Sequence, residues 1–383
     1  MRILHVIPSV NPLTGGPIEG VKQRGTELIR LGHSVEIVCL DDPNAAHLVD
    51  FPLPVHALGP SYGAYQYNRK LIPWLIRHAP AFDAVIVSGL WQYHAFATRS
   101  ALRQIGKPYF IFTHGMLDPW FKQTYPIKHF KKWLYWPWAE YRVLRDAQAV
   151  LFTSEEERLR ARQSFWLYRV HEKVVAYGSG APPDDREHLR EEFLMRFPEL
   201  RNRRILIFLG RIHEKKGCDL LIEALGRVKE LIPDLHLVMA GPDQDGWLVK
   251  LQQLAVTHGV QDKITWPGML RDTLKWGAFY ASEAFILPSH QENFGIAVAE
   301  ALSCGVPVLI SDKINIWREI DAAGAGFVAA DTVDGTENNL RRWLQLDISS
   351  RMSMGTHAIE AYAQHFSIAA MTASFLTAIC ETP

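Results

Sequence analysis

The sequence predicts an α/β protein built from two doubly wound domains. Its 383 residues exceed the length of one ordinary domain, and 48% hydrophobic with 21% charged residues is a globular composition. Short apolar runs alternate with helical stretches through both halves of the chain, a pattern typical of parallel sheets covered by helices. A segment rich in Gly, Pro and Asp at 178–185, GSGAPPDD, separates the halves and is the predicted linker.

We therefore expect an N-terminal Rossmann-like domain over residues 1–177 and a C-terminal one over 186–365. Residues 366–383 are expected to form a terminal helix, because their apolar residues recur at helical spacing and make one stripe. The members of this stripe are Ile368, Met371, Phe375 and Ile379.

Charge and cysteine content exclude several classes of protein. Lys and Arg number 41, as do Asp and Glu, so no net basic field predicts a nucleic-acid partner. The four cysteines are widely spaced without a CxxC pair, which disfavours a zinc site and a disulfide framework and fits reduced thiols in the cytoplasm. No run of 18 apolar residues predicts a transmembrane helix, and the apolar run at 3–10 is too short for a signal peptide.

The N-terminal half begins with a buried strand, a loop and a helix expected over 18–31. Gly15 and Gly16 stand at this strand-to-helix turn, where a backbone without Cβ can approach a phosphate or a sugar closely. The G-x-G-x-x-G fingerprint of dinucleotide sites is absent, and a turn that merely needs glycine is the alternative. The strands expected in this half are 2–10, 35–40, 84–88, 109–113, 150–153 and 174–176. His114 follows one of them and has either a structural or a functional role.

Residues 118–146 interleave Trp, Tyr and Phe with Lys and Arg. Such a segment can lie on an anionic membrane surface, with its aromatic rings at the level of the headgroups. It can equally be a half-buried helix with a solvated basic side. Both interpretations stay open on the residues alone.

The C-terminal half repeats the alternation, with strands expected at 204–209, 235–240, 264–266, 285–287 and 308–310. Its first loop, GRIHEKKG, places Arg211 and Lys216 at a strand end, where they can meet a diphosphate; a generic basic loop is the alternative. No Walker A motif is present, because GK[ST] does not follow the glycines. Asp243 and Asp245 form a D-x-D, which is frequent by chance, and we expect no metal site there.

A strand, loop, helix and strand over 285–312 form the most informative unit of the sequence. Glu292 lies in the loop after the first strand, where open α/β sheets bind ligands, and Glu300 lies about two turns into the helix. Asn293 is the expected N-cap of this helix. The amides of Asn293, Phe294, Gly295 and Ile296 lie at its positive end, so the unit suits an anion beside a polyol.

The pattern Glu292, seven residues, Glu300, set in PSHQENFGIAVAEALSCGVPV, resembles the E-x7-E signature of family 4 retaining glycosyltransferases of the GT-B fold. The segment 210–217 resembles the GR-x4-KG element of the same family. The resemblance implies two Rossmann-like domains facing across a cleft. It also implies a UDP- or GDP-sugar as donor, no metal and no further cofactor, and a glycan or lipid-linked acceptor.

The resemblance assigns roles to the motif residues. Arg211 and Lys216 would neutralise the diphosphate, Glu292 would hold sugar hydroxyls, and Glu300 would hold the ribose. His114 would meet the donor sugar from the first domain, where the loop of Gly15 and Gly16 would face the diphosphate and the acceptor. The terminal helix would cross back onto the N-terminal domain.

The expected function is therefore retaining sugar transfer in the synthesis of polysaccharide or cell-envelope glycan. A nucleotide-sugar epimerase, a phosphorylase of the same architecture and a non-catalytic subunit that binds sugar nucleotides are the alternatives. The expected location is cytoplasmic, with residues 118–146 as a peripheral contact with the inner face of a membrane.

Overall fold

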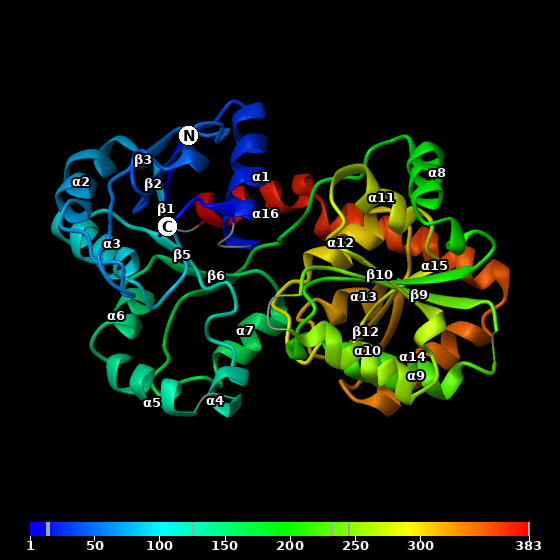
Figure 1. Cartoon of the computed structure of the whole chain (residues 1–383). Helices are drawn as coiled ribbons and strands as arrows, with labels where there is room; N and C mark the ends of the chain where they lie inside the picture. Colours follow the sequence, from blue (N-terminus) through cyan, green and yellow to red (C-terminus); the bar gives the residue numbers. More distant parts are fainter. Residues whose placement is uncertain (13–15, 125, 232, 244–245, 382–383) are drawn as a thin grey trace. The chain divides into compact units, whose positions relative to one another are not determined.

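The computed structural model of this chain describes residues 1–12, 16–124, 126–231, 233–243 and 246–381 (Figure 1). The chain divides into two compact units. The N-terminal unit comprises Met1–Gly178 together with Ile368–Pro383, and the C-terminal unit comprises Ser179–Ser367.

The N-terminal unit is organised around a parallel sheet in the order β3-β2-β1-β4-β5-β6-β7. The order reverses between β1 and β4, and the carboxyl ends of these two strands therefore flank a crevice that can admit a ligand. The strands are β1 (Arg2–Val6), β2 (Ser34–Cys39), β3 (Val55–Ala57), β4 (Ala84–Ser88), β5 (Phe110–Phe112), β6 (Ala149–Phe152) and β7 (Glu172–Val174).

Helices cover both faces of this sheet, and successive, mostly apolar side chains of its central strands β1 and β4 are accordingly buried on both sides. One face packs α2, α3 and α6, and the other packs α1 and α16. The helices of the unit are α1 (Gly16–Arg30), α2 (Leu71–His78), α3 (Tyr93–Gln104), α4 (Trp120–Thr124), α5 (Pro126–Tyr135), α6 (Glu140–Arg145), α7 (Glu155–Ala161) and α16 (Ile368–Cys380). Short 3-10 turns lie at Ala46–Leu48 and Ala79–Ala81.

The terminal helix α16 belongs to the N-terminal unit, where it packs against α1. The amide of Ala176 donates to Ser374 Oγ at 3.0 Å. The guanidinium of Arg24, which is buried, lies 4.7 Å from the ring centroid of Phe112 and 4.5 Å from that of Phe375. Arg24 therefore joins the sheet to α16 through stacked contacts.

The C-terminal unit has a second parallel sheet, in the order β10-β9-β8-β11-β12-β13. Its order reverses between β8 and β11. The strands are β8 (Arg204–Leu209), β9 (Leu235–Ala240), β10 (Ile264–Gly268), β11 (Ala284–Leu287), β12 (Val308–Ser311) and β13 (Gly326–Ala329).

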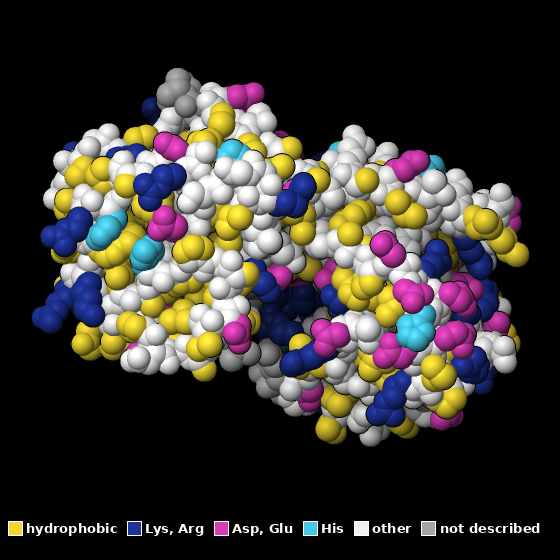
Figure 2. Space-filling model, turned by 90° about the horizontal axis from the view of Figure 1, so that it is seen from above, with side chains coloured by type: hydrophobic (Ala, Val, Ile, Leu, Met, Phe, Trp, Pro, Cys, Tyr) yellow, Lys and Arg dark blue, Asp and Glu magenta, His cyan; other side chains and the backbone are white. Residues whose placement is uncertain are grey.

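The helices of this unit are α8 (Arg186–Arg196), α9 (Cys218–Val228), α10 (Trp247–Thr257), α11 (Asp272–Tyr280), α12 (Ile296–Ser303), α13 (Trp317–Ala323), α14 (Val333–Gln345) and α15 (Ile348–Ala361). 3-10 turns lie at Pro198–Leu200, Glu214–Lys216 and Gln261–Lys263, and a π-helical turn spans Tyr362–Phe366. None of the helices in the described part of the chain combines the length and the apolar character that crossing a bilayer requires. Acidic and basic side chains are interspersed on the face of each unit that Figure 2 shows.

The predicted class, two doubly wound α/β domains, is confirmed. Several elements were not anticipated, among them the helices α2, α3, α8, α11 and α15 and the strand β3. The prediction that Asn293 caps α12 is wrong: the cap is Gly295, with φ 77° and ψ 67°. Glycine adopts this left-handed conformation without the steric cost that a Cβ imposes, which explains why the helix begins two residues later than the asparagine suggests.

Candidate active site

In the C-terminal unit, the motif residues gather at the carboxyl ends of β8 and β11, where the strand order reverses. Two loops meet there, 210–217 after β8 and 288–295 after β11. The carbonyl of Lys215 accepts hydrogen bonds from Ser289 Oγ and from the amide of His290, both at 2.9 Å. The two loops therefore form one surface.

Gly217 lets these loops approach each other. Its φ is +65°, and a Cβ at this position would lie 2.2 Å from the carbonyl oxygen of Pro288. The glycine that ends the GR-x4-KG segment is thus required both by its backbone conformation and by the space available.

Lys216 and Glu292 form an ion pair in direct contact across the two loops. Both side chains are largely buried, at 14% and 20% exposed. Burial and, next, the positive charges of Lys215 and Arg211 lower the pKa of Lys216 to about 7. Arg211 itself is exposed at the end of β8, where a ligand can reach its guanidinium.

The backbone of Glu292 is fixed by the loop after β12. Its amide donates to the carbonyl of Lys313 and its carbonyl accepts from the amide of Asn315, both at 3.0 Å. Asn315 Nδ2 also donates to Asn293 Oδ1 at 3.3 Å. The carboxylate of Glu292 is therefore presented by a rigid backbone, although its side chain lies in a loop.

Glu300 lies in α12 and pairs with Lys275 of α11, whose Nζ donates to Oε1 at 2.7 Å. Each of the two motif glutamates thus forms an ion pair with a different lysine. Lys275 was not anticipated, because it lies outside both motifs and reaches the site only through the packing of α11. No local signal in the sequence indicates this pairing, since Asp272, three positions before Lys275 in the same helix, offers the lysine a nearer acidic partner.

The segment 293–296 contributes backbone rather than side chains. Phe294 is buried, and its ring packs edge-on against Phe366 at a centroid distance of 5.9 Å. Since α12 begins at Ile296, the amides of its first turn point out of its N-terminus. This end of the helix carries partial positive charge beside Lys216 and Glu292.

In the N-terminal unit, His114 follows β5 in a left-handed conformation, with φ 47°. Its ring stacks on Phe112 at 5.4 Å, and its Nε2 has no hydrogen-bond partner among the described residues. Burial and then the positive charge of Arg24 lower the pKa of His114 to about 3. The imidazole is therefore neutral at physiological pH and can form hydrogen bonds as a neutral ring.

Gly16 begins α1, and its carbonyl accepts from the hydroxyl of Tyr177 at 2.7 Å. Gly15 lies outside the described residues. A cavity of about 320 Å³ lies at the carboxyl ends of β1 and β4, close to the start of α1. Its polar and flexible lining includes Ser9, Gln66, Ser88, Gln92 and Met116.

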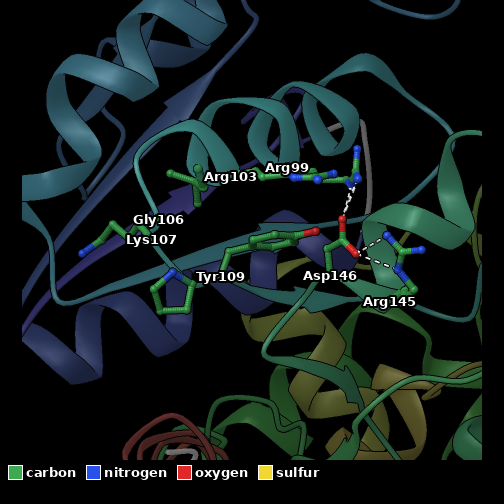
Figure 3. Close-up of a pocket in the computed structure, with 9 residues that line it drawn as sticks. Arg99, Arg103, Gly106, Lys107, Tyr109, Arg145 and Asp146 are labelled. Atoms are coloured by element: carbon green, nitrogen blue, oxygen red, sulfur yellow. Dashed lines mark hydrogen bonds and ion pairs between the residues drawn. The ribbon is translucent and has the colours of Figure 1, made fainter.

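A larger pocket, of about 530 Å³, lies beside the amino end of β5, at the opposite end of this strand from His114 (Figure 3). Arg99 and Arg145 point toward Asp146, whose carboxylate lies 2.6 and 2.7 Å from their guanidinium groups. Lys107 points away from them. Asp146 therefore neutralises part of the positive charge of this pocket, and the pocket is separate from the motif residues.

The D-x-D segment has a structural role at its first carboxylate. Asp243 accepts hydrogen bonds from the amides of Trp247 at 2.9 Å and Leu248 at 3.3 Å, at the start of α10. Asp245 lies outside the described residues. In the described ranges, no three His, Cys, Asp or Glu side chains converge as a metal site.

Comparison with known proteins identifies the class to which this fold and site belong. Solved structures of GT-B glycosyltransferases match the whole chain. Anabaena HepE in complex with UDP and glucose has a TM-score of 0.75 at 17% identity, and the match covers 100% of both chains. Sucrose-phosphate synthase from Thermosynechococcus elongatus has a TM-score of 0.72 at 17% identity over 99% of this chain and 98% of that one.

Two family descriptions match the sequence, "Glycosyl transferase 4-like domain" over residues 15–178 and "Glycosyl transferases group 1" over 190–361. The chain belongs to the family 4 glycosyltransferases.

Curated relatives match parts of the chain. Alpha-D-kanosaminyltransferase from Streptomyces kanamyceticus is 27% identical over 50% of this chain and 49% of its own length. D-inositol 3-phosphate glycosyltransferase from Mycobacteroides abscessus is 34% identical over 33% of this chain and 28% of its own length. The chain thus spans half or less of the length of these two relatives.

We predict that Gly217→Ala destabilises the C-terminal unit more than Gly268→Ala does. Both glycines are left-handed, at φ +65° and +73°, so alanine costs about 1 to 2 kcal/mol at each. Only at Gly217 does the new Cβ meet a backbone atom, because nothing lies within 4 Å of the position at Gly268. Overpacking adds about 1 to 3 kcal/mol. Urea unfolding of the full chain measures the difference, and equal midpoints would contradict the close contact between the two loops.

Proposed function

We propose that this protein transfers a sugar from a nucleotide-sugar donor to a second substrate. The observation that carries the proposal is the pair of Lys216 and Glu292, largely buried at the strand ends of the C-terminal unit beside the N-terminus of α12. A buried cation, a carboxylate and helix amides in one place suit a ligand that carries both phosphates and hydroxyls. Membership in the family supports the same activity.

Binding of the donor would exchange partners within the site. The diphosphate would take the place of Glu292 as the partner of Lys216, with Arg211 and the first-turn amides of α12 as further donors. Glu292 would then be available to hydroxyl groups of the sugar. The negative charge that develops on the departing diphosphate would be stabilised by these fixed positive groups, the task that a metal ion performs in other enzymes. We therefore propose transfer without a metal or a cofactor.

Glu300 is proposed to hold the ribose hydroxyls. Its carboxylate is already oriented by Lys275 at 2.7 Å, so it would accept hydrogen bonds without changing its conformation. A neutral His114 would donate or accept one hydrogen bond at a sugar hydroxyl. Its pKa of about 3 makes it unsuited to act as a general acid at neutral pH. None of these residues is proposed as a covalent nucleophile, and front-face substitution with retention is the mechanism we favour.

The cavity at the ends of β1 and β4 is the proposed acceptor site, and a glycan or lipid-linked sugar is the proposed acceptor. A cavity of about 320 Å³ is large enough for one sugar ring. The relatives named above are transferases, which argues against an epimerase. A non-catalytic subunit remains the alternative that the following experiment tests.

Nucleotide binding provides the first test. In a thermal-shift panel of UDP, GDP, ADP and their glucose conjugates with EDTA present, one nucleotide series should stabilise the protein, by about 2.7 kcal/mol at one hundred times its Kd. Glu300→Gln should lower the affinity for that nucleotide about tenfold, since the variant lacks the charged acceptor for the ribose hydroxyls. Glu292→Gln should leave the affinity for the nucleotide unchanged but should abolish sugar transfer. Stabilisation without any turnover of the donor would favour a binding subunit, and no stabilisation by any ligand would contradict the proposed site.

Nucleotide affinity should fall as the pH rises above about 7. Below this value Lys216 is already protonated and meets the diphosphate as a cation, whereas above it a proton must be taken up on binding. Each further pH unit then lowers affinity by up to about tenfold. Calorimetry in buffers of different ionisation enthalpy measures the proton uptake. Lys216→Arg, which keeps its charge throughout this range, is the matched control and should flatten the profile; an equally steep profile in this variant would exclude Lys216 as the titrating group.

We further propose that α5 and its surroundings contact an anionic lipid surface. None of the described residues of α5 is buried, and five large apolar side chains between 126 and 138 are 42% to 76% exposed, namely Ile127, Phe130, Trp133, Leu134 and Trp138. Lysines interrupt them at 128, 131 and 132. Apolar and aromatic side chains that point outward between cations suit the headgroup region of a bilayer.

Sedimentation with vesicles tests this contact. The protein should bind phosphatidylcholine vesicles only when phosphatidylglycerol is added, and salt should weaken binding. Phe130→Ser combined with Trp133→Ser should weaken it at least tenfold, because each ring removes apolar area worth about 1.5 to 3 kcal/mol when fully buried. Val249→Ser with Val256→Ser, which replaces exposed residues of α10, is the matched control. Equal loss in both variants would contradict the role of α5.

A further inference from the structure

Glu157, in the first turn of α7, is a buried carboxylate that accepts four hydrogen bonds. Its Oε1 accepts from Thr113 Oγ1 at 2.6 Å and from the amide of Gly115 at 2.5 Å. Its Oε2 accepts from the amide and the hydroxyl of Thr153, both at 2.7 Å. In the described part of the chain no Lys or Arg pairs with it. Its charge is therefore balanced by hydrogen bonds alone, which fix its position.

The two residues that donate the first two of these bonds flank His114 in the sequence. Thr113 precedes it, Gly115 follows it, and both donate to the same oxygen of Glu157. Between them, His114 has φ 47°, a conformation that costs a non-glycine residue about 1 to 3 kcal/mol. Such a conformation persists only where the surroundings fix it. The contacts to Thr153 anchor the carboxylate to the end of β6, the strand next to β5 in the sheet.

We propose that Glu157 is a positioning residue that holds the left-handed turn at His114 and so aims the imidazole, with its unpartnered Nε2, at the donor sugar. The inference rests on the proposed function of His114. It adds a residue that lies outside the motifs and acts through its neighbours rather than on substrate.

A glutamine cannot replace this carboxylate. The two backbone donors, the amides of Gly115 and Thr153, lie on different oxygens of Glu157. Whichever way a glutamine amide is turned, its NH2 group faces one of these N–H groups, which then loses its acceptor. If the amide of Gly115 is the one released, the turn at His114 opens. If that of Thr153 is released, the anchor of the side chain is lost. Either result moves the ring.

The first readout needs no substrate. Hydrogen–deuterium exchange of the full chain should show the amide of Gly115 or that of Thr153 exchanging at least tenfold faster in Glu157→Gln than in the wild type. Glu155→Gln is the matched control, because Glu155 lies in the same turn of α7, is 42% exposed and pairs with Arg158 on the surface. Unchanged exchange of both amides in Glu157→Gln would overturn the proposal. Should Glu157→Gln not fold, Thr113→Val removes one donor without changing shape and should accelerate the same exchange.

The second readout is release of UDP from UDP-glucose, or of GDP from GDP-glucose if the panel selects GDP. Glu157→Gln should lower kcat about 10- to 100-fold and leave nucleotide affinity unchanged, because the proposed nucleotide-binding residues belong to the C-terminal unit. In a His114→Ala background the same substitution should have no further effect. If Glu157→Gln lowers kcat by the same factor in the His114→Ala background as in the wild type, Glu157 acts on the whole fold rather than through His114. That result would overturn the proposal. Faster exchange with normal turnover in both Glu157→Gln and His114→Ala would instead refute the proposed role of His114 and leave the turn contact standing.

Discussion

The contact between Lys216 and Glu292 is the interaction on which the candidate site depends. The two residues are 76 positions apart in the sequence and belong to loops that follow neighbouring parallel strands. Parallel strands place their carboxyl ends at one edge of the sheet, so the loops meet there. Gly217 permits their close approach and the carbonyl of Lys215 joins them. A buried cation needs a partner, and Glu292 provides it until an anionic ligand can replace it.

The N-terminal unit uses a similar arrangement with different chemistry. Here a buried carboxylate, Glu157, joins the ends of β5 and β6 through hydrogen bonds rather than through an ion pair. Nearby, the buried Arg24 stacks on Phe112 and Phe375. Burial and then the charge of Arg24 lower the pKa of His114 and keep its ring neutral. Each unit thus holds one rigid turn at the end of a strand, and in each the rigidity comes from a buried charged group.

Local patterns in the sequence predicted most of the central strands. β4, β8 and β9 have the expected bounds, because continuous apolar runs between polar loops leave few alternatives. β3 was missed, since it is a short edge strand whose residues are all half-buried. The motifs that carry the family resemblance were equally local, and they led to Arg211, Lys216, Glu292 and Glu300. The prediction for the N-cap of α12 was wrong, because both Asn293 and Gly295 are residue types that can occupy an N-cap, and the structure uses the glycine two residues later.

By itself the sequence determined the fold class, the family and the segments in which the candidate residues lie, since periodicity and motif spacing are properties of neighbours in the chain. Only the tertiary structure decided the partners of those residues. It paired Lys216 with Glu292, Lys275 with Glu300, and Thr113 and Gly115 with Glu157. It also placed α16 on the N-terminal unit. The pairings join residues 25 to 76 positions apart, and the contact of Ala176 with Ser374 of α16 joins residues 198 positions apart. They depend on which strands and helices become neighbours, which no local pattern specifies.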